Sequence, residues 1–267
     1  MRVRPWCSVL TGRFSATGGC TRRTYPPYRE PVPGHLDHRL DLNADLGEEV
    51  TDDEALLAVV TSANVACGYH AGTPAIMRAV CERAAELGVS VGAQVSYADR
   101  AGFGRVARDV AHDVLREQVA DQVGTLSSIA AAAGTAVRYL KPHGALYHRV
   151  LDDEEQAAAV LAGSGDLPVL GMPGRLLAGA AAAGRGVFHE GFPDRGYTAS
   201  GRLVPRGEDG ALLTGTEDIA AQALRLAAGT DPGLDSLCLH GDTPGAVAHA
   251  HAVRRALEDA GWVLAGL

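Results

Sequence analysis

The amino-acid sequence predicts an α/β protein whose folded domain is a single seven-stranded parallel β/α barrel. From Leu40 onward, short apolar runs alternate with longer amphipathic stretches. A strand followed by a helix, repeated in this way, is typical of a parallel sheet with its helices outside. Seven such repeats fit between residues 39 and 267, which favours a closed barrel, with an open doubly wound sheet as the alternative.

Each repeat begins with a short apolar run of the kind that forms a buried strand. The expected strands are Leu40–Asn43, Ala63–Ala66, Val89–Val95, Val137–Leu140, Leu167–Leu170, Val187–Glu190 and Leu237–Leu239. The longer stretches between them have helical periodicity. The expected helices are Glu54–Val60, Ala75–Leu87, Val110–Ala133, Glu154–Ala162, Leu176–Ala183, Ile219–Ala228 and Ala246–Ala260.

Capping residues indicate where several of these helices begin and end. The run Thr51-Asp52-Asp53-Glu54 has the spacing of a capping box, with Thr51 as the cap. Thr73-Pro74 and Thr243-Pro244 each place a capping residue before a proline, which suits the first helical position. Glycines stand where helices should stop, at Gly88, Gly134, Gly184 and Gly261.

The first 38 residues differ in composition from the rest of the chain. They are rich in arginine and nearly free of acids, and they become proline-rich at Tyr25–Tyr28 and Pro31–Gly34. Because no apolar periodicity is present, we expect residues 1–38 to be a disordered N-terminal extension of the barrel domain, residues 39–267. We favour an upstream extension from an over-long start over a targeting peptide, because the segment lacks the apolar core of a secretion signal.

The composition excludes several classes of partner. The formal net charge is −8, whereas nucleic-acid binding needs clustered lysine and arginine. No apolar run approaches the roughly 18 residues that span a bilayer. The five cysteines are scattered without a C-x-x-C pair, which favours a reducing compartment. We therefore expect a cytoplasmic protein with no nucleic-acid or membrane partner.

Polar side chains follow the expected strands at their carboxyl ends, where β/α folds build their active sites. Asp41, Asn43 and Asp45 share one face of the first strand because side chains alternate along it. Buried carboxylates are costly unless they are paired. These residues therefore indicate a metal, another cation or a general base, with Asp41 and Asp45 as the candidate metal ligands. A strand-end cap and turn is the alternative.

Two histidines lie in the same short motif, His-x-x-Thr-Pro. His70 follows the second strand and His240 follows the seventh. The helix expected beyond each would present free N–H groups and a positive dipole end to an anion. Histidine can also transfer protons or bind a metal near neutral pH. A purely structural role is the alternative for each one.

Lys141 ends the fourth strand and is the only lysine in the core segment. An ammonium group suits a phosphate or a developing oxyanion, and a surface lysine beside a turn proline is the alternative. After the sixth strand, Arg195 or Arg206 could hold a substrate carboxylate through two hydrogen bonds. A salt bridge between Asp194 and Arg195 within that loop is the alternative.

Glycines after the third strand, in Gly102-Phe103-Gly104-Arg105, indicate a mobile loop that covers the site. The chain contains no P-loop, no G-x-S-x-G elbow and no H-E-x-x-H motif. These absences leave the strand-end residues as the main source of chemistry.

Four long motifs resemble those of the LamB/YcsF family. They are Asp41–Glu48, Ser62–Gly72, Lys141–Tyr147 and His240–Val247. The resemblance runs from about Leu40 to the C-terminal end. It implies a seven-stranded barrel related to polysaccharide deacetylases. It also implies ATP-driven cleavage of 5-oxoproline to L-glutamate, in a complex with subunits B and C of 5-oxoprolinase.

The chain departs from the family pattern at one place. Many relatives carry His-Pro where this chain has Gln94-Val95. We interpret Gln94 as a polar substitute that still forms hydrogen bonds.

The implied reaction needs cations near phosphate, a base for water and an acid for the ring nitrogen. Lys141 would hold phosphate or an oxyanion, Asp45 or Asp242 would be the base or a Mg²⁺ ligand, and Arg195 would hold the substrate carboxylate. The full expected catalytic set is Asp45, His70, Lys141, His143, His240 and Asp242, with the histidines moving protons. The expected substrate-binding set is Asn43, Gln94, Glu190 and Arg195. ATP, with Mg²⁺, is the expected cofactor.

Two alternatives belong to other classes. A metal-dependent amidase or carbohydrate deacetylase would use Asp45, His70 and His240 as metal ligands on the same barrel. A non-catalytic binding protein would only hold 5-oxoproline for a partner.

Overall fold

Seven parallel strands form a closed ring in the computed structural model, which describes residues 39–50, 52–229 and 233–267. The strands follow one another around the ring in chain order, and β1 pairs with both β2 and β7 to close it. This arrangement confirms the predicted barrel. The predicted disorder of residues 1–38 and the predicted cap at Thr51 lie outside the described residues.

The strands lie close to where the apolar runs predict them. They are β1 (Arg39–Leu46), β2 (Ser62–Ala66), β3 (Ser90–Val95), β4 (Val137–Pro142), β5 (Val169–Gly171), β6 (Val187–Gly191) and β7 (Ser236–Leu239). A short strand that the sequence did not predict, β8 (Val263–Leu264), pairs with the first two residues of β1. Both β1 and β4 extend past their predicted ends, and the added residues include Asp45 and Lys141.

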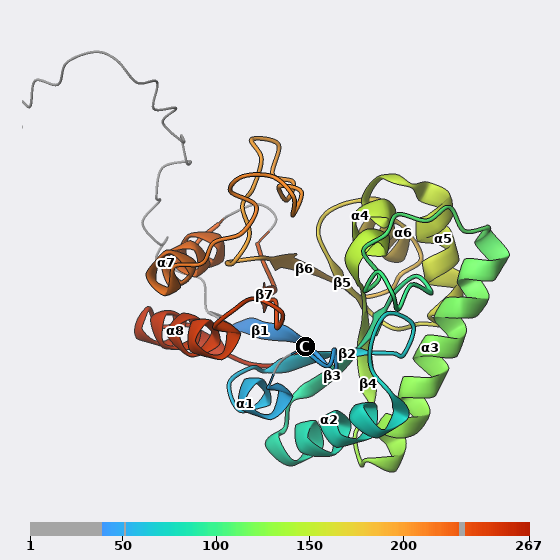
Figure 1. The fold of residues 1–267 in the computed structure, drawn as a ribbon, viewed down its shortest axis with the longest axis horizontal. Coiled ribbons are helices and arrows are strands. Elements are labelled where there is room, and N and C mark those ends of the chain that lie inside the picture. Colours follow the sequence, from blue (N-terminus) through green and yellow to red (C-terminus); the bar gives the residue numbers. More distant parts are fainter. Residues whose placement is uncertain (1–38, 51, 230–232) are drawn as a thin grey trace, which may run out of the picture. The chain divides into compact units, whose positions relative to one another are not determined.

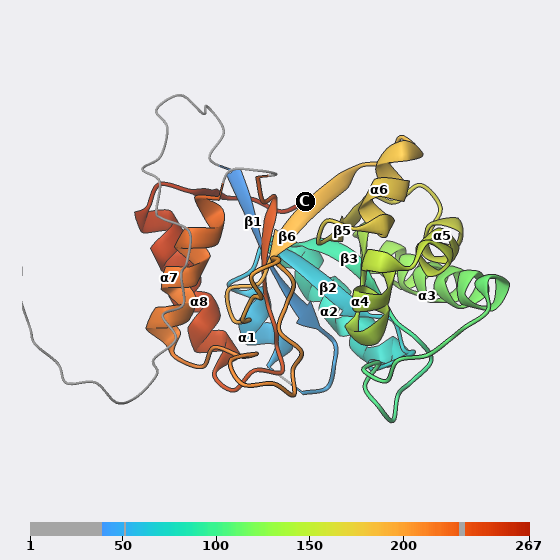
Figure 2. The ribbon, with the colours of Figure 1, turned by 90° about the horizontal axis from the view of Figure 1, so that it is seen from above.

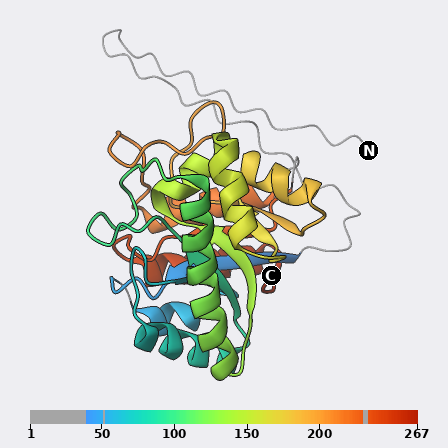
Figure 3. The ribbon, with the colours of Figure 1, turned by 90° about the vertical axis from the view of Figure 1, so that its right-hand side faces the viewer.

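Helices surround the ring of strands, as Figure 1 shows, and the long α3 runs along the side that faces the viewer in Figure 3. The helices are α1 (Asp53–Leu57), α2 (Pro74–Leu87), α3 (His112–Ala132), α4 (Gly144–Asp152), α5 (Glu154–Gly163), α6 (Arg175–Ala182), α7 (Thr216–Ala227) and α8 (Ala246–Asp259). No described helix combines the length and the apolar character that crossing a membrane requires.

Alternation along β1 sorts its side chains into two buried faces. Leu40, Leu42, Ala44 and Leu46 belong to the main hydrophobic cluster. The polar residues between them are also buried, but they contact other strands of the ring; Asn43, for example, bonds to Ser236 of β7. The predicted inward face of the first strand is therefore present, and it gives the barrel a polar interior.

Of the two threonine–proline caps that the sequence predicts, one is confirmed and one is wrong. Asp52 caps α1, and its side chain accepts a hydrogen bond from the backbone N–H of Ala55. Thr73 caps α2 with Pro74 in the first turn, as predicted. The predicted cap at Thr243 is wrong: α8 begins at Ala246, because the Thr243 hydroxyl donates to the buried carboxylate of Asp194 instead.

The sequence also failed to predict α4. Its N-cap is His143, whose side chain makes no capping hydrogen bond, and Gly144 follows with a positive φ of 60°. Neither residue is a usual start signal for a helix.

The loops that follow the strands lie along the lower part of Figure 2, so the carboxyl ends of the strands and these loops form one edge of the barrel.

A substitution at Gly92 can test how closely the barrel interior is packed. A Cβ at this position of β3 would lie 2.2 Å from the ring of Tyr139. We expect Gly92→Ala to lower the free energy of unfolding by about 1–3 kcal/mol, the usual cost of overpacking. Urea denaturation of the purified protein measures the change.

The matched control is Gly124→Ala in α3, where an added Cβ meets nothing within 4 Å. This change should be neutral or should stabilise by about 0.5–1 kcal/mol, because alanine favours helices. Equal effects of the two substitutions would contradict the close packing of Tyr139 on Gly92.

Candidate active site

A cavity of about 240 Å³ opens at the carboxyl ends of the strands. Asp45 of β1, Lys141 of β4, His143 and His240 all contribute to its wall. Arg105, Arg195 and Arg206, from the loops after β3 and β6, line it as well. The structure therefore brings together four of the six residues predicted to be catalytic, from three separate parts of the chain.

Lys141 is the centre of a buried polar cluster at the bottom of this cavity. Its ammonium nitrogen lies 3.1 Å from Asp45 Oδ1 and 3.2 Å from Glu190 Oε2. The same nitrogen lies 3.0 Å from the Cys238 sulfur, and the side chain is only 3% exposed. The alternative of a surface lysine beside a turn is therefore wrong. The ammonium has two carboxylates within reach and little solvent.

The carboxylates around Lys141 have different proton affinities. Although burial alone would raise it, the pKa of Asp45 is held well below its usual range by Lys141 and the nearby histidines. Burial raises the pKa of Glu190, and Lys141 offsets this only in part. Burial opposes the charge on Lys141, but the two carboxylates raise its pKa well above the usual value. The cluster thus holds a charged pair, Lys141 and Asp45, beside a carboxyl group that retains a proton more readily.

A hydrogen-bond network of side-chain amides and hydroxyls holds the Asp45 carboxylate in place. The Asn64 amide nitrogen donates to Asp45 Oδ1 at 2.9 Å and to Asn43 Oδ1 at 2.6 Å. The Tyr139 hydroxyl donates to Asn64 Oδ1 at 2.7 Å. Asn43 continues the network to Ser236, whose hydroxyl donates to Asp41. Asn43 is therefore a support beneath the cavity, because it does not line the wall.

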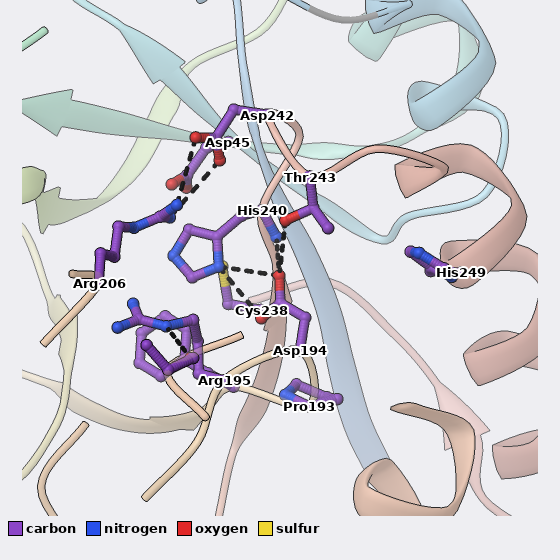
Figure 4. A network of polar contacts seen from close by, with 12 residues as sticks. Asp45, Pro193, Asp194, Arg195, Arg206, Cys238, His240, Asp242, Thr243 and His249 are labelled. Atoms are coloured by element: carbon purple, nitrogen blue, oxygen red, sulfur yellow. Dashed lines mark hydrogen bonds and ion pairs between the residues drawn. The ribbon is translucent and has the colours of Figure 1, made fainter. Parts of the chain in front are cut away.

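His240 is oriented by a buried carboxylate, as Figure 4 shows. Its Nδ1 lies 3.0 Å from Oδ2 of Asp194, which also accepts from the backbone N–H of His240. A carboxylate only accepts hydrogen bonds, so Nδ1 carries the proton and Nε2 is left for acid–base chemistry. The Phe192 ring stacks on the imidazole at 5.3 Å. The predicted salt bridge between Asp194 and Arg195 is absent from the described ion pairs because Asp194 bonds to His240 instead.

Asp242 lies apart from the Lys141 cluster. Its carboxylate forms ion pairs with Arg105, from the loop after β3, and with Arg206, 3.3 Å away in the loop after β6. Figure 4 shows the Arg206 contact. These two arginines lower the pKa of the half-buried Asp242, although burial opposes the shift. Asp242 therefore connects the loops over the cavity.

Arg195 mainly supports its own loop. Its guanidinium donates to the backbone carbonyl of Ala211 at 3.0 Å and to that of Val204 at 2.8 Å. The side chain is buried, with only 2% of the residue exposed. Two of its donors are thus used within the loop, which leaves Arg105 and Arg206 as the better-placed cations for a substrate anion.

A second buried cluster adjoins the first and contains Glu48, His70, Gln94 and His143. The imidazoles of His70 and His143 stack with their centroids 4.0 Å apart. Glu48 Oε1 lies 3.3 Å from His143 Nδ1 and 3.6 Å from His70 Nε2. The Gln94 amide nitrogen lies 2.8 Å from this oxygen and 2.9 Å from His143 Nδ1. His70 and Gln94 are therefore screened from the cavity, whose wall includes only His143 from this cluster.

The loop after β3 closes over the second cluster. Phe103 meets both imidazoles edge-on, and its carbonyl oxygen lies 3.1 Å from His143 Nε2. A Cβ on Gly104 would lie 2.3 Å from the Ser96 hydroxyl and 3.0 Å from His70 Cβ. Only glycine permits this close approach. The loop thus covers the cluster as predicted, while its predicted mobility stays a prediction.

Among the described residues, the metal-ligating side chains that come together are Glu48, His70 and His143. The set predicted for a metal-dependent amidase, with Asp45 and His240, is not assembled among these residues, because Asp45 pairs with Lys141 and His240 bonds to Asp194. Asp41 is likewise separate: it accepts hydrogen bonds from Thr61 and Ser236 at the far end of β1 from Asp45.

Several residues of the site were missed by sequence reasoning. Glu48 stands in the first motif but beyond the end of its strand. Cys238 reads as an ordinary strand residue, and Asp194 as a loop acid. Asn64 lies inside an apolar strand run, and a buried amide there was the one signal that could have pointed to the polar network.

Comparison with known proteins gives consistent results. Residues 40–267 match the sequence model of the LamB/YcsF family. Over 242 residues the chain is 55% identical to a Streptomyces coelicolor protein named as the A subunit of 5-oxoprolinase, and the match covers 83% of this chain and 97% of the relative. A Mycolicibacterium gilvum protein with the same name is 48% identical, covering 85% of this chain and 98% of the relative.

Solved structures are similar as well. The crystal structure of the lactam utilization protein from Thermus thermophilus matches with a TM-score of 0.77 at 35% identity, over 85% of this chain and 98% of that one. The catalytic domain of a peptidoglycan N-acetylglucosamine deacetylase from Eubacterium rectale matches with a TM-score of 0.51 at 12% identity, over 90% and 92%. At that identity the second match shows only that the fold is shared with a deacetylase.

Asp41 allows a test of the buried polar network by pH. Burial raises its pKa from 3.8 to about 6, against the hydrogen bonds from Ser236, Ser62 and Thr61. Folded Asp41 therefore keeps a proton that the unfolded chain releases, so its contribution is complete below about pH 4 and is lost as the pH rises through 6. Across this window the free energy of unfolding of the wild type should decline by up to about 3 kcal/mol because of Asp41. We expect Asp41→Asn to lack this decline.

Chemical denaturation of both proteins between about pH 4 and pH 7 measures the difference. Wild type should lose stability relative to Asp41→Asn as the pH rises. Parallel curves for the two proteins would show that Asp41 is ionised in the fold and that the inner network is arranged otherwise.

Proposed function

Because the chain belongs to the LamB/YcsF family, we propose that it is the A subunit of an ATP-dependent 5-oxoprolinase. This enzyme would open the lactam ring of 5-oxoproline to give L-glutamate. Relatives at 55% and 48% identity carry the name of that subunit. The observation that carries the proposal is the buried Lys141–Asp45 ion pair, which faces a cavity suited to a small ring.

The reaction needs activation because amide resonance makes a lactam a poor electrophile. Transfer of the γ-phosphoryl group of ATP to the amide oxygen releases ADP and makes the ring carbon electrophilic. Water then adds to that carbon, the C–N bond breaks, and the nitrogen takes up a proton. Hydrolysis of the resulting acyl phosphate gives L-glutamate and phosphate. The protein must therefore supply a cation for oxygen and phosphate, a base for water and an acid for nitrogen.

Lys141 supplies the cation. Its ammonium group is fixed by Asp45, Glu190 and Cys238 and lies at the cavity wall. A preorganised charge in a site with little water stabilises a developing oxyanion more strongly than a solvated one. Its raised pKa keeps it protonated while it does so.

Asp45 and His240 divide the proton transfers between them. We assign Asp45 as the acceptor of a proton from the attacking water because its ionised carboxylate lines the cavity. His240 also lines the cavity, and Asp194 leaves its Nε2 free to take up a proton from solvent and then pass it to the ring nitrogen. Asp194 is a positioning residue in this scheme, since it acts through His240.

Arg206 and Arg105 would hold the substrate carboxylate or the transferred phosphate. Both line the cavity and share Asp242 as their partner. They would take the role of holding the substrate carboxylate that was first expected for Arg195, because the guanidinium donors of Arg195 are partly used within its loop. His143 is less suited to proton transfer, because both of its ring nitrogens have partners inside the protein.

The binding of ATP requires more than this cavity. Its volume of about 240 Å³ falls below the roughly 300–1,000 Å³ of pockets for drug-sized ligands. It suits a five-membered ring and a phosphoryl group better than a whole nucleotide. We therefore propose that ATP, with Mg²⁺, is bound together with partner subunits B and C. The described cysteines are buried free thiols, which supports the proposal that the protein functions in the reducing cytoplasm.

Reconstitution tests this proposal. The full chain is co-expressed with candidate B and C subunits, and 5-oxoproline-dependent release of phosphate and of L-glutamate is measured. We expect both products in equal amounts, only when all three subunits are present. Unchanged phosphate release without 5-oxoproline, or no glutamate from an assembled complex, would contradict the proposed activity.

Lys141→Met should abolish most of the turnover of the assembled complex. Loss of a preorganised charge at a developing oxyanion costs about 10²–10³-fold in kcat, and phosphate release measures it. The matched control is Arg83→Met, which removes a cation from an exposed ion pair with Glu86 on α2. Thermal unfolding of each variant shows whether it folds. A folded Lys141→Met complex with wild-type turnover would remove Lys141 from the chemistry.

Asp194→Asn and His240→Gln should impair turnover through the same step. Each change should lower kcat by about 10²–10⁴-fold, the range for general acid–base catalysis. The double variant should be no worse than the poorer single one, because Asp194 acts only through His240. Steady-state kinetics of the three complexes gives the comparison, and additive losses would show that the two residues act independently.

A further inference from the structure

The second buried cluster has the spacing of a metal site. A tetrahedral ion with ligand bonds of about 2.0–2.2 Å holds its ligand atoms roughly 3.4 Å apart. Glu48 Oε1 lies 3.3 Å from His143 Nδ1 and 3.6 Å from His70 Nε2. The three ligand atoms all lie within 4.8 Å of one another. One carboxylate with two imidazoles is a set that zinc and related ions favour.

His70 gives an independent sign that something is bound there. The residue is only 1% exposed, and neither of its ring nitrogens has a hydrogen-bond partner among the described residues. A buried polar atom without a partner costs about 1–3 kcal/mol, and nearly all such atoms in folded proteins are satisfied. A metal ion between His70 Nε2 and Glu48 would give that nitrogen the partner that the described residues do not supply.

His143 is already oriented as a metal ligand. Its Nε2 lies 3.1 Å from the carbonyl oxygen of Phe103, which can only accept a hydrogen bond. The proton therefore sits on Nε2, and the lone pair on Nδ1 faces Glu48. Metal-bound histidines usually donate their second nitrogen in this way, which fixes the ring.

Gln94 can complete the set of ligands. Its amide nitrogen lies between Glu48 and His143, whereas its carbonyl oxygen is buried without a partner. A half-turn of the amide exchanges the two atoms and brings the oxygen to the same place. That turn would be unfavourable beside a bare carboxylate, but a cation in the centre would favour it.

We propose that Glu48, His70 and His143 bind a divalent transition-metal ion such as Zn²⁺, with the Gln94 oxygen as a fourth ligand. Asp45 Oδ2 lies 4.0 Å from His143 Nδ1, so the site adjoins the Lys141 cluster without including Lys141. The inference concerns binding by this chain alone and does not rest on the proposed lactam chemistry. Failure of one would leave the other standing.

Zinc binding by the full chain tests the proposal without any measurement of turnover. Protein stripped with a chelator is titrated with ZnCl₂ by calorimetry, and bound zinc is counted by elemental analysis after gel filtration. We expect about one zinc per chain, and Co²⁺ in its place should give the visible absorption of a four-coordinate site. A chain that retains no stoichiometric zinc overturns the proposal.

Three variants locate the ion. His70→Gln and Glu48→Gln should each weaken the Kd for zinc by at least about 10–100-fold, the loss known even for outer-shell changes. The matched control is His249→Gln, since His249 is also buried but contacts Thr216 and Pro244 through its two nitrogens and lies away from His240 in Figure 4. It should bind zinc like wild type. Equal zinc binding by His70→Gln and His249→Gln would show adventitious binding elsewhere and overturn the proposal.

Gln94→Glu gives a test that misfolding cannot imitate. The carboxylate has nearly the same shape as the amide but is a stronger metal ligand, so zinc affinity should rise. In metal-free protein it adds a second acid beside Glu48, and the melting temperature should fall until zinc restores it. Weaker zinc binding by a folded Gln94→Glu variant would contradict the position of the ion beside Gln94.

Discussion

The burial of one ammonium group is the constraint on which this site depends. Lys141 is the only lysine in the chain, and its side chain is 3% exposed. Removing a charge from water costs several kcal/mol unless a partner compensates it. Asp45 supplies that compensation as an ionised carboxylate, while Glu190 is more easily protonated. The positive charge of Lys141 and the negative charge of Asp45 balance each other, so the pair stays ionised although little solvent reaches it.

That balance requires the register of the strands. In the ring, Lys141 of β4 is opposite Gln94 of β3, and Asn43 of β1 is opposite Cys238 of β7. A slip of one residue in any of these strands would turn its inward side chain toward the helices. The apolar residues of β1 pack outward in the main hydrophobic cluster. Hydrophobic burial outside the ring thus holds the polar residues inside it, and the fold and the site are specified together.

The barrel was predictable because its signal is local. Apolar runs of strand length alternate with helical periodicity, and both can be seen in the sequence without knowing which segments meet. The same reasoning found Asp45, Lys141 and His240, which lie at the ends of strands. It missed α4, whose start at His143 and Gly144 carries no usual capping signal.

The rest of the site depends on contacts between distant segments. Glu48 reaches His70 and His143 only because the chain folds back after β1, and Asp242 meets Arg105 across 137 positions of sequence. Alternation along a strand carries no information about such pairs. Equivalent motifs also diverged: His70 is stacked against His143, whereas His240 is held by Asp194. The shared His-x-x-Thr-Pro pattern could not show that difference.

The protonation of Lys141 can be measured directly, because a chain with one lysine gives a single lysine Nζ signal in ¹⁵N NMR. The account predicts that this signal keeps its ammonium chemical shift beyond the usual pKa of 10.5 until the protein unfolds. A signal that titrates below that pKa, with a neutral amine near pH 7, would contradict the ion pair on which the proposed chemistry rests.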